Sequence, residues 1–127
     1  MTARRFVALG AALSGIAVAA GAFGAHALRA RLSPGDVAVF ETGARYQMYH
    51  GLALIAVAWV ADRWPGPLAS AAGWCLLLGI MLFSGSLYAL ALSGVRGLGA
   101  ITPLGGVAFL AGWGCLVLAV GREGVRA

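Results

Sequence analysis

The chain has 127 residues, of which 61% are hydrophobic and only 10% are charged, and its formal net charge is +5. Soluble domains are about half apolar and about a quarter charged, so this composition excludes an ordinary soluble domain. No basic run is interleaved with aromatic residues as a nucleic-acid surface requires, so we expect no nucleic-acid partner. All nine basic residues are arginines, and they lie in or near the connections between apolar segments, which is typical of membrane anchoring.

Four apolar segments dominate the sequence, over about residues 6–28, 44–61, 68–92 and 98–120. Each approaches or exceeds the roughly 20 residues that a helix needs to cross about 30 Å of hydrocarbon. Because lipid offers no partner for an unpaired backbone amide or carbonyl, such segments must be helical. The sequence therefore predicts an all-α fold in which residues 1–127 form one domain. This domain is an integral membrane bundle of four transmembrane helices in a lipid bilayer.

The first segment has some features of a signal peptide. Arg4 and Arg5 precede an apolar run, and residues 25–27 resemble a cleavage site. The run is longer than the roughly 7 to 15 apolar residues of a signal peptide, and three more apolar segments follow, so we interpret it as a retained span. Phe6 follows the two arginines directly, which also disfavours a twin-arginine signal.

A further helix is predicted between the first and second spans. Ser33–Asp36 combines a capping serine, a proline suited to the first helical position and an acid near the positive helix end. Glu41 can reach Arg45 across one helical turn. We interpret residues 34–43 as a short interfacial helix that lies along the bilayer and bends near Gly43 into the second span.

The remaining connections are marked by proline and glycine. Residues 64–67 read Trp-Pro-Gly-Pro and predict a tight turn between the second and third spans. Residues 93–99 are rich in glycine, and Thr102–Pro103 repeats the cap-then-proline pattern, so the fourth helix is expected to begin by Thr102.

Small residues form two stripes that predict close helix packing within the bundle, with packing between copies as the alternative. The stripes are Gly15, Ala19 and Ala22 in the first span, and Gly105, Gly106 and Gly112 in the fourth. Cys75 and Cys115 are interpreted as small apolar fillers, because two thiols make neither a disulfide framework nor a zinc site.

Arginine counts give a weak indication of topology. With four spans, both termini share a side with the connection around Arg63, and this side has five arginines against four on the other. Because positive charge favours the cytoplasmic side, we expect both termini in the cytoplasm.

Polar residues gather toward the end of the bundle opposite the termini, and a polar side chain in a membrane is a functional candidate by default. The candidates are His26, Tyr46, Gln47, His50, Ser84, Ser86, Tyr88 and Thr102. The sharpest hypothesis is that His26 and His50 meet as a metal or haem ligand pair or as a proton relay. No carboxylate lies at ligand spacing from them, so hydrogen bonds between helices explain them equally well and we expect no metal or cofactor.

The third and fourth spans contain no acidic or basic residue, which disfavours a proton-driven small multidrug exporter. The sequence also lacks a nucleophile elbow, a phosphate-binding glycine loop and paired carboxylates, so we expect no enzyme. The first interpretation is a structural or assembly protein with a membrane-protein partner or further copies of itself. The alternative is a protein that binds or transports a lipid or small molecule around His26 and His50. A third, an enzyme or haem protein, requires a cofactor.

Several strings resemble the bacterial domain-of-unknown-function 423 family, whose eukaryotic relatives are the transmembrane protein 256 proteins. They are Gly21–Leu28, Phe40–Gly43 with Tyr46–His50, Phe83–Tyr88, and Ile101–Gly106 with Gly112–Trp113. Gly35 and Gly51 depart from the bulkier residues expected there. The resemblance implies a small multi-pass protein of the bacterial inner membrane, and it supplies no catalytic residues.

Overall fold

A computed structural model describes residues 1–121, and this part of the chain is helical throughout apart from short connections, which confirms the predicted all-α fold. The α-helices are α1 (Ala3–His26), α2 (Pro34–Arg63), α3 (Pro67–Gly79), α4 (Gly85–Ser93) and α5 (Thr102–Gly121). A π-helical turn at Ile80–Ser84 joins α3 to α4, so that the two form one continuous arm. Turns of 3₁₀ helix lie at Leu28–Ala30 and Arg96–Ala100.

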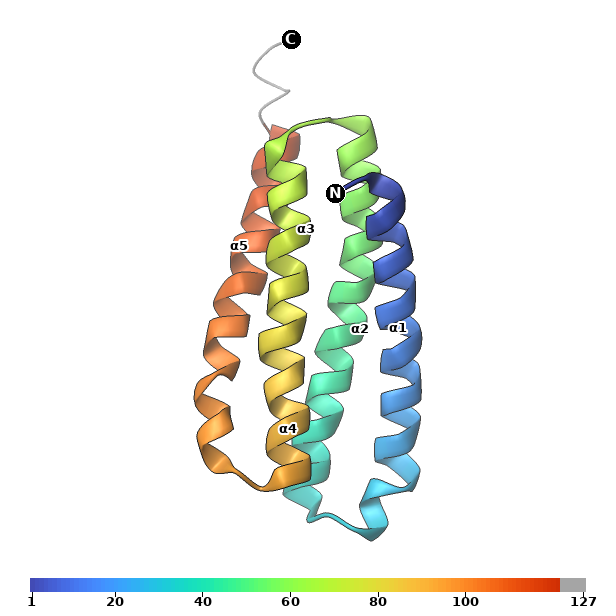
Figure 1. The fold of residues 1–127 in the computed structure, drawn as a ribbon, viewed down its shortest axis with the longest axis vertical. Coiled ribbons are helices and arrows are strands. Elements are labelled where there is room, and N and C mark those ends of the chain that lie inside the picture. The colour runs from blue at the N-terminus through green and yellow to red at the C-terminus, as the bar shows by residue number, and fades with distance from the viewer. Residues whose placement is uncertain (122–127) are drawn as a thin grey trace.

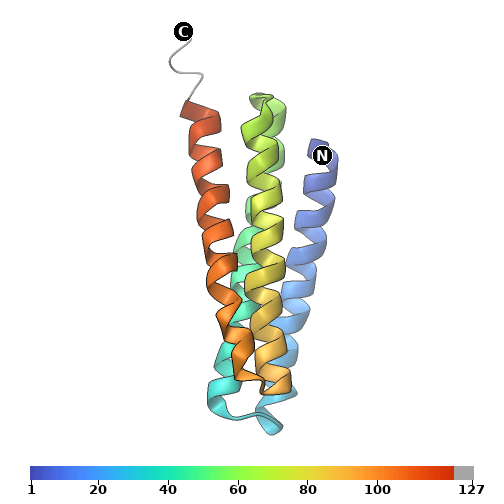
Figure 2. The ribbon, with the colours of Figure 1, turned by 60° about the vertical axis from the view of Figure 1, so that its left-hand side comes forward.

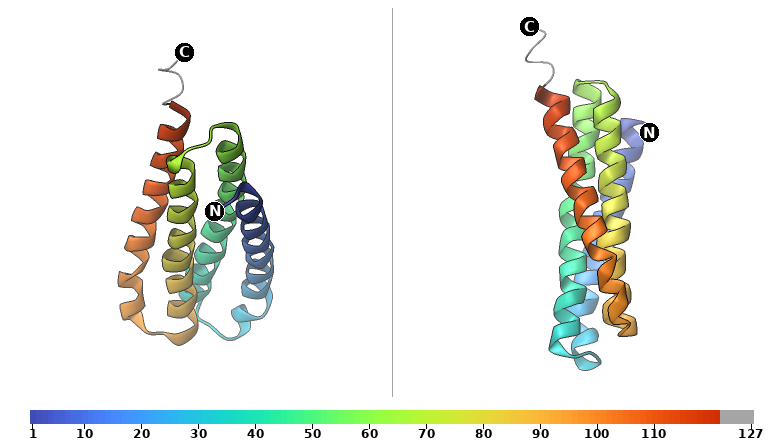
Figure 3. Two further views of the ribbon diagram at one scale, coloured as in Figure 1. Left: turned by 45° about the horizontal axis from the view of Figure 1, so that its top comes forward. Right: turned by 90° about the vertical axis from the view of Figure 1, so that its left-hand side faces the viewer.

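The four helical arms are antiparallel and stand in an open row (Figure 1). The first helix, α1, packs on α2, which packs on the α3–α4 arm, and α3 packs on α5. Figures 1 and 2 both show α1 and α5 on opposite flanks, and the left-hand view in Figure 3 agrees. Because α1 and α5 each pack mainly on one neighbour, each leaves a broad face uncovered by the described chain.

Three of these arms are long and apolar enough to cross a membrane, namely Ala3–Ala30, Pro67–Ser93 and Arg96–Gly121. The fourth, α2, has 30 residues and so is about 45 Å long, but it carries the polar run from Tyr46 to His50. The start of α1, the turn between α2 and α3, and the end of α5 share one end of the bundle (Figure 1). We call this the terminal end, and the opposite one the loop end.

The predicted interfacial helix at residues 34–43 is wrong as a separate element, because α2 continues without interruption from Pro34 to Arg63. Its beginning is as predicted, since Ser33 Oγ accepts a hydrogen bond from the Asp36 amide at 3.1 Å. The first turns stand upright because Val37 and Phe40 are buried in a cluster with Leu28 and Ala91. Lying along the bilayer would expose these apolar side chains.

The main core lies in the half of the bundle nearer the terminal end, where Phe6, Leu54 and Leu76 are completely buried. The Phe6 ring lies against Gly73, where an added Cβ would come within 2.2 Å of it. The turn at residues 64–67 separates α2 from α3 as predicted. Cys115 packs against this core as a filler.

The small-residue stripe predicted for the first span does not pack within the bundle. Gly15, Ala19 and Ala22 are exposed, whereas Gly10 and Gly24 are buried against α2. Residues seven positions apart lie on the same side of a helix. Because α1 packs mainly on α2, only the line of residues that faces α2 is covered. On α5, Gly105 and Gly112 are also seven positions apart, and both pack against the α3–α4 arm as predicted. Gly106 instead faces open space.

Candidate functional site

Three of the predicted polar residues lie deeper in the bundle than the sequence indicates. His26 is exposed at the loop end of α1, but Gln47 and His50 lie near the middle of α2, and Ser84 lies in the interior of the α3–α4 arm. The difference arises because residues 34–43 are the first turns of α2. Ten helical residues rise about 15 Å, which moves the residues after them away from the loop end.

Gln47 is buried and connects three helices. Its Nε2 donates a hydrogen bond to the Leu13 carbonyl of α1 at 2.8 Å, and its Oε1 accepts one from the Tyr88 hydroxyl of α4 at 2.8 Å. A carbonyl oxygen has two lone pairs, so Leu13 can accept this bond beside its bond within the helix. The amide is therefore used on both sides to hold α1, α2 and α4 together.

Ser84 makes a second connection between helices. It is fully buried at the end of the π-helical turn, and its Oγ donates to the Gly43 carbonyl of α2 at 2.7 Å. A Cβ on Gly43 would lie 3.0 Å from the Tyr88 ring and 3.3 Å from the Ser84 carbonyl oxygen. A larger residue at position 43 would therefore require the Tyr88 ring or the Ser84 backbone to shift by a few tenths of an ångström.

Ser86 connects α4 to the first residue of α5. Its Oγ donates to the Phe83 carbonyl at 3.0 Å and lies 2.7 Å from Thr102 Oγ1. A serine hydroxyl has one proton, so the Thr102 hydroxyl must be the donor of the second bond. Both predicted candidates are thus engaged with each other.

His50 is 5% exposed and is bonded at both ring nitrogens. Trp113 Nε1 donates to Nε2 at 3.3 Å, and an indole nitrogen can only donate, so Nε2 is unprotonated. Assigned in this way, the neutral imidazole carries its proton on Nδ1 and donates to the Tyr46 carbonyl at 2.7 Å. The ring stacks on Phe109 with 3.4 Å between centroids and an interplanar angle of 6°.

A groove of about 510 Å³ opens beside His50, between α2, the α3–α4 arm and α5. Its lining is mostly apolar and aromatic, with few polar atoms, which suits an apolar or weakly polar molecule. The residues that form it are Tyr46, His50, Phe83, Pro103, Gly106, Val107, Phe109, Leu110 and Trp113.

The structure does not bring His26 to His50. Ser14 of α1 lies level with Gly51, where an added Cβ would be 2.6 Å from Ser14 Oγ. Twelve helical residues separate Ser14 from His26, which is about 18 Å along the helix. Within residues 1–121, moreover, no three His, Cys, Asp or Glu side chains come together as a metal site would require.

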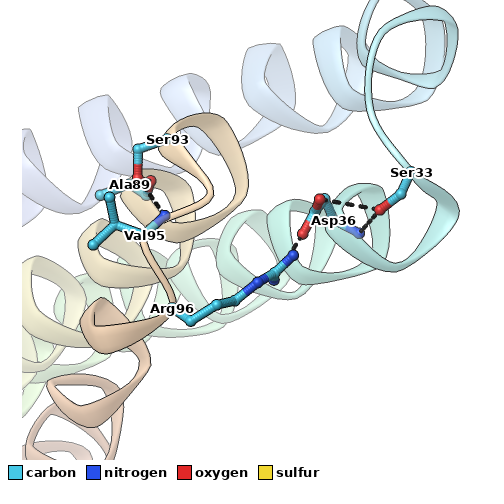
Figure 4. Close-up of polar contacts among 6 residues, drawn as sticks. All are labelled: Ser33, Asp36, Ala89, Ser93, Val95 and Arg96. Carbon is cyan, nitrogen blue, oxygen red and sulfur yellow. Dashed lines mark hydrogen bonds and ion pairs between the residues drawn. The ribbon is translucent and has the colours of Figure 1, made fainter.

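The loop end carries an ion pair between segments distant in sequence (Figure 4). Arg96 Nη1 donates to Asp36 Oδ1 at 3.0 Å, and Ser33 Oγ donates to Asp36 Oδ2 at 3.0 Å. Asp36 lies in the first turn of α2, before its apolar part. Hydrogen bonds from Arg96 and then Ser33 hold the pKa of the Asp36 carboxyl below its ordinary value. This contact ties the connection before α5 to the start of α2.

The second ion pair at this end differs from the sequence prediction. Glu41 does not pair with Arg45 but with Arg29 of the α1–α2 connection, at 3.6 Å. Arg45 is exposed and forms no ion pair with any residue in the described range 1–121. The pairing with Arg29 depends on how the connection folds back on α2, which helical spacing alone does not specify.

Sequence reasoning missed several partners in these contacts. The carbonyls of Leu13 and Gly43 accept hydrogen bonds from side chains of other helices. A backbone carbonyl has no signature in a sequence, so nothing marked them. Trp113 was visible in a string that resembles the family, and Arg96 was visible as the only charged residue in its connection.

These features define a small multi-pass membrane protein whose polar side chains connect its helices. A family model described as "Protein of unknown function (DUF423)" matches residues 20–106. The chain belongs to this family.

Relatives support the same assignment over nearly the whole chain. A UPF0382 membrane protein of Staphylococcus haemolyticus is 48% identical over 113 residues, which cover 89% of this chain and 92% of the relative. The UPF0382 membrane protein YwdK of Bacillus subtilis is 48% identical over 115 residues, which cover 90% and 94%. No solved structure gives a significant match.

Proposed function

We propose that the protein is a structural or assembly component of the bacterial inner membrane, with both termini in the cytoplasm. The observation that carries this proposal is the use of the buried polar side chains. Gln47, Ser84 and His50 are each bonded to a group on the same chain, mostly on another helix. Side chains engaged in this way stabilise a rigid bundle rather than offer free groups for catalysis.

The uncovered side of α1 is a suitable surface for a partner. Gly15, Ala19 and Ala22 are exposed on it, and small residues allow another helix to approach closely. A membrane-protein partner or another copy of this chain would fit there, and lipid covers the surface otherwise.

The topology part of the proposal is supported by the arginines. Arg4, Arg5 and Arg63 lie at the terminal end, and Arg122 and Arg126 lie outside the described residues. Arg45 belongs to the interior of α2 rather than to a loop, which widens the difference in loop charge. A reporter fused after Ala127 should be active only in the cytoplasm, and periplasmic activity would contradict this topology.

Native mass spectrometry tests the assembly role, on protein extracted gently from its own membrane at native expression. We expect reproducible co-isolation of a membrane protein or a defined oligomer. Gly15→Leu should disrupt it, whereas Gly114→Leu is the matched control on the opposite flank, because an added side chain has open space at both positions. A single copy without a protein partner would contradict the proposal.

The groove beside His50 favours a second candidate, a protein that binds or transports a small molecule or lipid. Under this candidate, a molecule that co-purifies with the protein should be lost in His50→Ala. His26→Ala is the control, because His26 lies at the loop end and not on the groove. Retention of the molecule in both variants would exclude the groove.

A further inference from the structure

A second groove runs along the junction of α1 and α2, away from the His50 groove. It consists of two adjoining hollows that share Glu41, with volumes of about 420 Å³ and about 310 Å³. The hollow at the loop end is lined by Arg29, Leu32, Pro34, Val37, Ala38 and Glu41. The deeper one is lined by Ala17, Gly21, Glu41, Ala44, Arg45, Met48 and Tyr49.

The charges in this groove do not cancel. Arg29 and Arg45 line it with the single carboxylate of Glu41, which pairs with Arg29 at 3.6 Å. Arg45 has no acidic partner within residues 1–121. The groove therefore has an excess positive charge, to which a phosphate group is complementary.

The depth of Arg45 makes such a partner important. It is eleven residues into α2, about 16 Å from the start of the helix. An arginine without a counter-ion is costly in hydrocarbon, so its side chain must extend toward the headgroups or meet an anion there. A lipid headgroup whose phosphate lies between the helices supplies an anion that Arg45 can reach. Basic pockets between transmembrane helices bind acidic lipids in this way.

The remainder of the groove is apolar. Ala17, Gly21, Ala44 and Met48 line its deeper part. A Cβ added to Gly21 would meet nothing within 4 Å, so this position leaves room for a slender apolar chain. A charged mouth that continues into an apolar trough matches the shape of a phospholipid.

We infer that the α1–α2 groove binds an anionic phospholipid of the bilayer. Its phosphate lies between Arg29 and Arg45, and one acyl chain lies along Gly21, Ala44 and Met48. This site is separate from the proposed assembly role, so each can fail without the other.

The test uses the full chain in nanodiscs that contain equal amounts of dioleoylphosphatidylglycerol and dioleoylphosphatidylcholine. Native mass spectrometry of the released protein should show phosphatidylglycerol retained in preference to phosphatidylcholine. Arg45→Gln and Arg29→Gln should each reduce that preference about fivefold, the effect expected for one arginine near an anionic headgroup. Arg31→Gln removes the same charge at the same end but lies off the groove, so it should keep the preference.

A second pair of variants tests the apolar part. Gly21→Leu should fill the trough and reduce lipid retention, whereas Gly114→Leu of α5, which also faces open space but lies off the groove and off the proposed partner surface, should not. Equal retention of both lipids by the wild type would overturn the inference. So would a preference that persists in Arg45→Gln, an equal loss in Arg31→Gln, or displacement of the lipid by millimolar inorganic phosphate, which would indicate a site for the free anion.

Discussion

The Tyr88 hydroxyl of α4 donates to Gln47 Oε1 of α2 at 2.8 Å, although the two residues are 41 positions apart. The same amide donates to the Leu13 carbonyl of α1. One buried side chain therefore connects three of the four arms near the middle of the bundle.

This relationship predicts a measurable coupling. Gln47→Leu should lower the free energy of unfolding by about 1 to 2 kcal/mol, because it leaves the Tyr88 hydroxyl without its partner. Tyr88→Phe in the Gln47→Leu background should cost less than Tyr88→Phe alone, since no bond remains to be broken. Denaturation of the protein in detergent micelles, followed by circular dichroism, measures all four species. Additive effects would mean that the two side chains do not interact.

Two adjacent glycines of α5 should respond oppositely to the same substitution. A Cβ at Gly105 would lie 2.4 Å from the Phe83 amide nitrogen, whereas at Gly106 it would meet nothing within 4 Å. Gly105→Ala should destabilise the bundle by about 1 to 3 kcal/mol, because backbone atoms must move apart. Gly106→Ala should be neutral or stabilising by up to about 1 kcal/mol, because alanine favours helix. Thermal unfolding of both variants decides, and equal losses of stability would contradict the packing of α5.

The helices themselves could be predicted because their signals are local. Three predicted features depend only on neighbours in sequence, and all three are present in the structure. They are the four apolar helical stretches, the Ser33 cap and the turn at residues 64–67. The orientation predicted for residues 34–43 is wrong, because the actual orientation depends on the burial of Phe40 against other helices. A local pattern shows that a face is apolar, but not what covers it.

The same limit applies to the site. The chemistry of their side chains marks the eight polar residues as candidates in the sequence, and in the structure Gln47 is hydrogen-bonded to Tyr88 and Ser86 to Thr102. The sequence does not predict which of these residues form hydrogen bonds with each other, or that His26 lies apart from the other candidates. Both depend on how the helices are aligned lengthwise, and packing sets that alignment. The sequence also does not show which glycines of α1 pack against another helix. That depends on α1 having one main neighbour.

The contact between Asp36 and Arg96 predicts a dependence of stability on pH. Hydrogen bonds from Arg96 and Ser33 lower the pKa of Asp36 in the folded state, so its carboxylate stabilises the fold at pH values above the ordinary aspartate pKa. This stabilisation should disappear as the pH falls through the lowered pKa. Asp36→Asn should remove that part of the acid sensitivity. Unfolding midpoints between pH 2 and pH 7 test it, and identical pH profiles for wild type and variant would refute the role of Asp36.

The two histidines should differ sharply when each is replaced by alanine. His50 is buried, stacked on Phe109 and bonded to Trp113, so His50→Ala leaves a void and an unpaired indole N–H, at a cost of about 2 kcal/mol or more. His26 is exposed at the end of α1, so His26→Ala should change stability by less than about 0.5 kcal/mol. If the histidines acted as a pair, each single variant would carry most of the loss and the double variant little more. We expect instead that the losses of stability in the two single variants add up in the double variant, with most of the loss from His50→Ala. About 18 Å along the helix separates the level of His26 from that of His50. Unfolding of both single variants and the double variant provides the comparison.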